Sequence, residues 1–175
     1  MKNLFQRIAS SFGYGERSHG KFRTTVIGSS SCSLSLPAEA SHFTCTSTRT
    51  GDAMHFGEAM DASGVTYGVI TICLHVPIPD GPSAQALLST FMDALHPSFG
   101  VVHVSGAERD LPHCSCLQTR GISDYWQDSE GIDWKVKGWT NGRQVAVLYV
   151  RNINNADACT ADIFLDSIRF QQQQS

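Results

Sequence analysis

Residues 116–151 constrain the fold most, because they contain three β-rich runs separated by two turn sequences. Asn141-Gly142 lies between the second and third runs, and Asn-Gly readily supplies the two positive φ angles of a type I′ hairpin turn. A two-residue loop there predicts three opposed pairs: Trp139 with Gln144, Val136 with Val147, and Trp134 with Tyr149. The stretch is therefore expected to form three consecutive antiparallel strands.

The turn before the second run predicts a register as well. Asp128-Ser129-Glu130-Gly131 is rich in turn-forming residues and reads as a four-residue loop. That loop would create one aromatic pair and one charge pair: Tyr125 with Trp134, and Asp124 with Lys135. A slip of one residue would move every side chain to the other face, so this register also decides which face each tryptophan occupies.

Size and composition limit the classes of protein to consider. A chain of 175 residues is long enough to fold as one domain around its own core without metal or disulfide support. Its 41% hydrophobic and 17% charged residues are typical of a globular protein. A net charge of −3 without a basic cluster argues against nucleic acid as a partner, and no apolar run is long enough to span a bilayer.

The two ends of the chain are expected to lie outside the packed domain. Residues 1–20 predict a short amphipathic helix followed by a flexible, glycine-containing connection, and residues 171–175 predict a disordered tail. Gln6 and Arg7 interrupt what would be the apolar segment of a secretory signal, so a cytoplasmic protein is expected. In that compartment the six cysteines are expected to be reduced thiols.

Residues 21–170 predict a single α+β domain, in which an antiparallel, strongly meandering β-sheet packs against two principal helices. Strand patterns precede the meander at residues 21–27, 32–36, 42–50, 54–60 and 65–76. Apolar stripes at helical spacing predict helices over residues 84–96, with Ser83 as N-cap, and 158–168. Residues 98–114 are ambiguous, with a short strand indicated near residues 101–104. We expect both helices to pack on one face of the sheet.

This order of elements resembles bacterial domains of the PsbP-like and DcrB-like superfamily, whose fold also includes a Ran-binding nuclear-import factor. Four segments carry the resemblance: Leu34-Ser35-Leu36-Pro37, Gly64 to Tyr67, Asn141 to Val150, and Phe164-Leu165-Asp166-Ser167-Ile168-Arg169-Phe170. The resemblance implies a small binding or assembly factor that is generally not an enzyme. Some DcrB-like proteins are chaperones of type VI secretion effectors, so an adaptor or chaperone role, with a link to secretion, is implied here.

One cluster of soft metal ligands is present. Cys114 and Cys116 would point to the same face of an extended strand, so both thiolates could reach one zinc ion, with His103 or His113 as a third ligand. Structural zinc sites more often use cysteine pairs with wider spacing on turns, and no second pair follows. Buried thiols are therefore the preferred interpretation, a metal- or thiol-dependent site is the alternative, and no cofactor is predicted.

The predicted registers place Trp126 and Trp139 on the face opposite Trp134, together with Lys135 and Lys137. Large aromatic residues ringed by charge favour protein recognition, although the N-terminal segments could also cover them. The sequence thus predicts a non-enzymatic protein-binding or assembly factor that uses this sheet face. Binding of a small ligand between the sheet and the helices is a further alternative.

Overall fold

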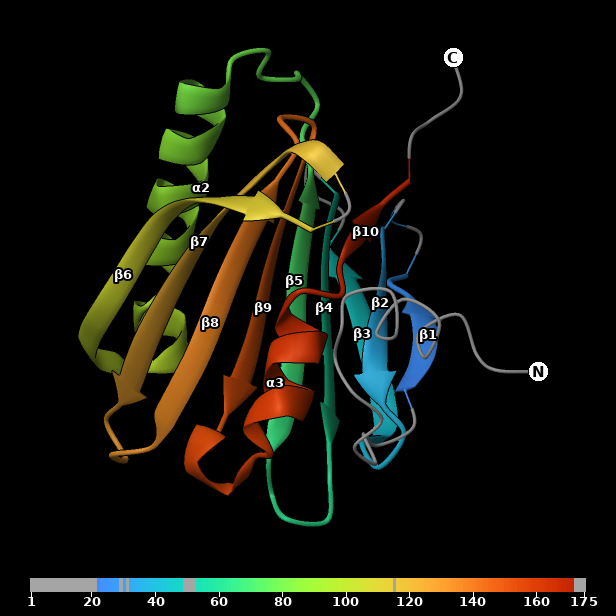
Figure 1. The fold of residues 1–175 in the computed structure, drawn as a ribbon, viewed down its shortest axis with the longest axis vertical. Coiled ribbons are helices and arrows are strands. Elements are labelled where there is room, and N and C mark those ends of the chain that lie inside the picture. The colour runs from blue at the N-terminus through green and yellow to red at the C-terminus, as the bar shows by residue number, and fades with distance from the viewer. Residues whose placement is uncertain (1–21, 29, 31, 49–52, 115, 172–175) are drawn as a thin grey trace.

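The computed structural model describes residues 22–28, 30, 32–48, 53–114 and 116–171 (Figure 1). The predicted N-terminal helix and C-terminal tail lie outside the described residues. The strands are β1 (Phe22–Val26), β2 (Cys32–Pro37), β3 (Ser41–Thr48), β4 (Ala53–Met60), β5 (Thr66–Cys73), β6 (Val101–His113), β7 (Cys116–Asp128), β8 (Asp133–Thr140), β9 (Gln144–Arg151) and β10 (Arg169–Phe170). The helices are α2 (Gly81–Leu95) and α3 (Ala158–Leu165), with 3-10 turns η1 (Pro97–Phe99) and η2 (Ile153–Asn155).

Seven strands form an antiparallel sheet in the order β3-β4-β5-β9-β8-β7-β6, and β1, β2 and β10 form a smaller one. This confirms the predicted single α+β domain. The helices, however, lie on opposite faces of the large sheet, so the prediction that they share one face is wrong. Helix α2 covers one face, whereas α3 and the small sheet cover the other (Figure 1).

Each face of the large sheet has its own core. The α2 face is rich in aromatic residues, with Trp126, Trp134 and Tyr149 packed beneath Leu88 and Met92. The α3 face is mainly aliphatic and joins strands β5, β8 and β9 to α3 and β2. Strand β9 is buried along nearly its whole length because it contributes side chains to both cores.

The β7–β8 register differs from the prediction by one residue. Trp126 pairs with Trp134 and Tyr125 with Lys135, because the connecting loop has three residues and closes with Asp128 N–H donating to the Ile132 carbonyl at 3.1 Å. Gly131 has a φ of 77°, the left-handed conformation that ends such a three-residue loop. The slip moves Trp126 and Asp124 to the α2 face, opposite to the predicted one.

The β8–β9 register differs by two residues, so each side chain keeps its predicted face. Trp139 pairs with Ala146, Val136 with Tyr149 and Trp134 with Arg151. The loop is longer than expected because the Asn141 side chain accepts hydrogen bonds from the backbone N–H groups of Arg143 and Gln144, at 3.0 and 2.8 Å. Asn141 does not adopt the positive φ of a type I′ turn, whereas Gly142 does, at 80°.

Two boundaries also differ. Helix α2 begins at Gly81 because Asp80, and not Ser83, is its N-cap: the Asp80 carboxylate accepts the Ser83 backbone N–H at 2.8 Å. The ambiguous region up to residue 114 is mostly the long edge strand β6. Within the described chain, neither helix has the length and apolar character needed to cross a membrane.

Candidate functional site

The predicted contact surface is not formed. Trp126 is 1% exposed on the α2 face, where its ring packs edge-on against His96 at a centroid distance of 4.8 Å. Trp139 is 3% exposed on the opposite face, where its indole N–H donates to the Leu165 carbonyl at 2.8 Å. The structure therefore separates the two tryptophans and places each in a core. Trp139 shares its core with β2 and α3, whereas Trp126 packs against His96 and Phe99 at the end of α2 and not against the N-terminal segments.

Lys135 and Lys137 do share the Trp139 face, but they hold α3 in place. Lys135 Nζ lies 2.5 Å from Asp162 Oδ1, and Lys137 Nζ lies 2.7 Å from Asp166 Oδ1. Burial lowers the pKa of Lys135, but the hydrogen bond and charge of Asp162 outweigh burial, so the pKa is raised overall. Both lysines are thus engaged within the fold.

The structure separates His103 from the other predicted metal ligands. His103 pairs with Gln127 toward the start of β6, whereas His113 pairs with Cys116 beside the β6–β7 turn, next to Cys114. His113 packs edge-on against Trp139, and burial, followed by the charge of Arg169, lowers its pKa to about 4. Across the described residues, no group of three or more His, Cys, Asp or Glu side chains could hold a metal ion.

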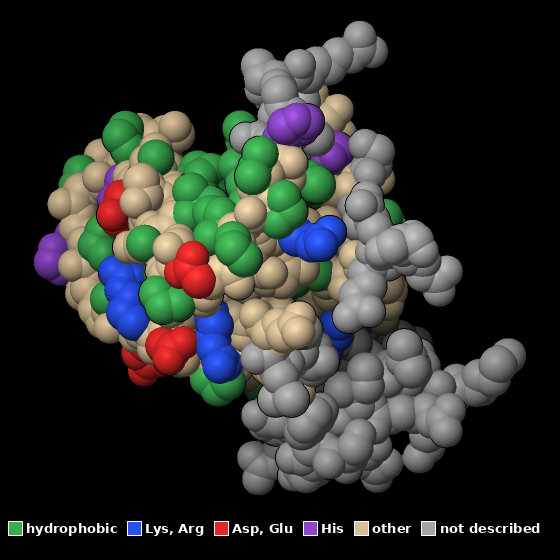
Figure 2. All heavy atoms as spheres, turned by 90° about the horizontal axis from the view of Figure 1, so that it is seen from above, with side chains coloured by type: hydrophobic (Ala, Val, Ile, Leu, Met, Phe, Trp, Pro, Cys, Tyr) green, Lys and Arg blue, Asp and Glu red, His purple; other side chains and the backbone are tan. Residues whose placement is uncertain are grey.

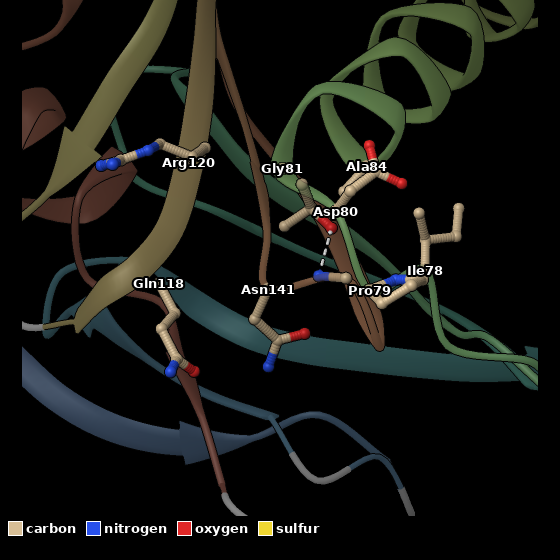
Figure 3. Close-up of a pocket in the computed structure, with 10 residues that line it drawn as sticks. Ile78, Pro79, Asp80, Gly81, Ala84, Gln118, Arg120 and Asn141 are labelled. Carbon is tan, nitrogen blue, oxygen red and sulfur yellow. Dashed lines mark hydrogen bonds between the residues drawn. The ribbon is translucent and has the colours of Figure 1, made fainter.

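A pocket of about 390 Å³ opens instead on the α2 face, at the end of the sheet where the helix begins (Figure 3). It is bounded by the start of α2, the preceding loop, the beginning of β7 and the β8–β9 turn. Its lining residues are Ile78, Pro79, Asp80, Gly81, Ala84, Gln118, Arg120, Thr140, Asn141 and Gly142. We call this the α2 pocket.

The loop between β5 and α2 is fixed to the β8–β9 turn by two backbone hydrogen bonds. Leu74 N–H donates to the Arg143 carbonyl at 2.9 Å, and Ile78 N–H donates to the Gly142 carbonyl at 2.7 Å. A Cβ atom on Gly142 would lie 2.3 Å from the Ile78 carbonyl oxygen, so the close approach requires glycine as well as the positive φ. The loop that forms one wall of the α2 pocket is therefore held in place by the β8–β9 turn.

The polar groups that line the pocket mostly serve the fold. The hydrogen bond from Ser83 lowers the pKa of Asp80, so this carboxylate is charged and occupied as a helix cap. Thr140 Oγ1 donates to the Gln144 carbonyl at 2.9 Å and accepts the Gly142 N–H at 3.1 Å. Arg120 extends away from α2, and its Nε lies 3.3 Å from Asp110 Oδ1 (Figure 3). Polar surface predominates in the lining, to which Gln118 and Arg120 contribute, and Ile78, Pro79 and Ala84 supply the apolar part.

Exposed apolar residues adjoin this pocket. Val76 is 73% exposed, the highest value among the large hydrophobic side chains of the described chain, and Pro77 and Pro79 are exposed beside it. We call residues 74–79 the apolar loop. Figure 2 views this end of the molecule and shows hydrophobic side chains gathered near its centre, with the acidic side chains to the left of them. An apolar patch beside a concave pocket is a common arrangement in protein recognition.

A second group of unusual side chains lies near the other end of α2. Trp126 Nε1, Asp124 Oδ1 and His96 Nε2 are buried without a well-formed hydrogen bond within the described part of the chain, although the Trp126 N–H is close enough to Asp124 to lower the pKa of that carboxyl. Burial raises the pKa of Asp124, and Arg109, whose Nη1 lies 3.8 Å from Asp124 Oδ1, offsets only part of that effect. These atoms are sealed from solvent, so the α2 pocket is the more accessible candidate for binding.

Sequence reasoning placed residues 74–76 of the apolar loop in the strand predicted over residues 65–76, with Pro77 and Pro79 ending it, whereas β5 ends at Cys73. The signal that could have identified them is Val76 and Ile78 placed among three prolines, where neither helix nor strand pairing can bury them. Comparison with protein-family models gives no match to this sequence, and none of the curated proteins matches it. The resemblance to PsbP-like and DcrB-like domains therefore stays a prediction.

Proposed function

We propose that the chain is a protein-binding or assembly factor that holds a partner segment at the α2 pocket and the apolar loop. The observation that carries this proposal is the 73% exposure of Val76 beside a pocket whose wall the same loop provides. Burying such a side chain on binding contributes about 1.5–3 kcal/mol. The implied role of PsbP-like and DcrB-like domains, binding without catalysis, points the same way.

The partner group suited to the pocket is an apolar side chain on an extended segment. Asp80, Thr140 and Asn141 already use side-chain oxygens to cap α2 and close the β8–β9 turn, so few polar groups remain to orient a reaction. Ile78, Pro79 and Ala84 supply the apolar part of the lining, and the loop is tied by backbone hydrogen bonds, so little ordering is needed on binding. A preformed pocket with a small apolar part beside the exposed Val76 favours recognition.

The test uses two variants that change this surface while leaving the fold intact. Val76→Ser removes the exposed apolar side chain, and Gly81→Leu partly fills the pocket, where an added Cβ meets no atom within 4 Å. Val102→Ser is the matched control, because Val102 is 67% exposed but lies at the start of β6, toward the other end of the molecule. All three should keep the wild-type free energy of unfolding within about 0.5 kcal/mol.

The measurement is quantitative capture of partners from the source cell, followed by a binding isotherm with the purified partner. We expect the same partner to be lost with Val76→Ser and Gly81→Leu and retained with Val102→Ser. Retention of the partner by both pocket variants would exclude this surface. If Gly81→Leu instead abolishes a thermal shift produced by a small molecule while partner capture persists, the α2 pocket is a small-ligand site.

A further inference from the structure

The large sheet has two edges, and they differ in how well they are protected against further strand pairing. An edge strand presents unpaired backbone N–H and C=O groups, and proteins usually blunt it with bulges, charges or proline. Strand β6 has all three devices. Its pairing with β7 shifts register at four points, Gly106 and Asp110 have positive φ, Pro112 removes a donor, and Glu108-Arg109-Asp110 adds charge.

Strand β3, at the other edge, has few of these protections. After one irregularity between Ser41 and Thr44, its pairing with β4 is regular from Thr44 to Thr48. Residues 41–48 contain no proline, lysine, arginine, aspartate or glutamate. The side chains from Thr44 to Ser47 are exposed, and no strand pairs with the outer side of β3 in the described part of the chain.

The chemistry of β3 suits pairing with itself. A two-fold contact brings the same surface of both copies together, so the surface must be complementary to itself. An antiparallel pair of β3 strands would set threonine, serine and cysteine side chains against the same residue types, without opposing like charges. Cross-strand pairs of threonine stabilise antiparallel strands.

The surroundings of β3 support the same contact. Met60, in register with Ser41 at the start of β3, is 55% exposed and supplies apolar surface close to the edge. On the α3 face, the ring of Phe43 lies over Gly57, where an added Cβ would come within 2.3 Å of it. The strand is thereby packed against β4, so a pairing partner meets an edge already held in place.

We propose that β3 pairs antiparallel with β3 of a second copy, so that one continuous sheet runs through a two-fold dimer. This proposal is independent of the α2 pocket and the apolar loop. The apolar loop follows β5, outside the paired edge, and stays accessible in such a dimer. Each copy would then present one pocket for a partner segment.

The test compares two lysine substitutions by sedimentation velocity over a range of protein concentrations. Thr46→Lys places like charges at the proposed contact and should raise the dimer dissociation constant at least about tenfold. Ser105→Lys is the matched control, because Ser105 is an exposed residue of the other edge strand and its substitution should leave the dimer unchanged. Circular dichroism and the melting temperature confirm that both variants are folded.

Amide hydrogen exchange of the wild type locates the contact. We expect protection of residues 44–47 to increase with protein concentration, while that of residues 102–105 stays constant. A wild type that remains monomeric, or a dimer insensitive to Thr46→Lys, overturns the proposal. Protection of β3 that is independent of concentration would also overturn it, because the chain itself would then cover this edge.

Discussion

The two faces of the large sheet hold their helices by different interactions. On the α3 face, Trp139 donates to the carbonyl of Leu165, and two lysines of β8 form ion pairs with Asp162 and Asp166. On the α2 face, Leu88 and Met92 pack closely over the sheet, and Gln85 Nε2 donates to the Gly121 carbonyl at 3.3 Å. Trp126 Nε1 and Asp124 Oδ1 lie in the same core without a well-formed hydrogen bond among the described residues.

Helix length accounts for much of this difference. Helix α2 has 15 residues and can be held by an apolar stripe, whereas α3 has 8 residues and relies on directed polar contacts. The same sheet therefore combines a face that holds its helix by directed polar contacts with one that holds its helix mainly by apolar packing. An unmade buried hydrogen bond costs about 1–3 kcal/mol, so the two faces should respond differently to matched substitutions.

The largest difference is expected between the two tryptophans. Trp139→Phe removes volume and takes the donor away from the Leu165 carbonyl, which should lower the free energy of unfolding by about 3 kcal/mol. Trp126→Phe removes similar volume and a buried N–H group that makes no well-formed hydrogen bond and acts only through its effect on the pKa of Asp124, so it should cost only about 1 kcal/mol. Urea denaturation at neutral pH measures both, and equal losses would contradict the comparison.

The tryptophans also show how far the sequence predicts the fold. The pattern of residues 116–151 correctly predicts three antiparallel strands, because alternation and turn residues act locally. Loop length is harder to predict from the sequence. In the β7–β8 connection the left-handed Gly131 allows a three-residue loop, and in the β8–β9 connection the Asn141 side chain closes a loop longer than two residues. The one-residue error moves Trp126 to the wrong face, whereas the two-residue error leaves Trp139 on the predicted one.

The candidate site was much harder to predict than the strands. Its walls come from the apolar loop, the start of α2, β7 and the β8–β9 turn, which are distant in sequence and meet only after the sheet has formed. The long β6 strand was equally hidden, because its bulges destroy the alternation by which strands are recognised. Both the α2 pocket and strand β6 depend on contacts between segments that are distant in the sequence.

Packing of α2 provides the second test. A Cβ atom on Gly138 would lie 2.6 Å from Met92 Sδ and 2.7 Å from Leu88 Cδ1, and both side chains are fully buried. Gly138→Ala should therefore push α2 from the sheet and cost about 2 kcal/mol. Gly81→Ala, at the start of the same helix, meets no atom within 4 Å and should change stability by less than about 0.5 kcal/mol.

Thermal denaturation, with tryptophan fluorescence as a probe of the α2 core, measures both glycine variants. A neutral Gly138→Ala would show that α2 can move without loss, and that close packing does not hold this helix. A destabilising Gly81→Ala would instead show that the start of the helix is more constrained than its open surroundings indicate.

The smallest effect, and the only stabilising one, is expected at Asp124. Asp124 and Asp128 are buried four residues apart on the α2 face of β7. Burial raises the pKa of Asp124. Burial acts in the same direction at Asp128, but hydrogen bonds from Ile132, Trp134 and Arg151 outweigh it and lower the pKa.

These opposite shifts predict opposite pH profiles. A carboxyl with a raised folded-state pKa adds stability below its unfolded pKa, near 3.9, and loses that contribution as pH rises through the folded value. Asp124→Asn should therefore match the wild type near pH 3 and be the more stable protein at pH 7. Asp128→Asn should be less stable than the wild type at pH 7, with the difference shrinking as pH falls and the wild-type carboxylate is protonated. Urea denaturation from pH 3 to 8 measures both profiles, and a loss of stability in Asp124→Asn at pH 7 would show that its charge is compensated within the fold.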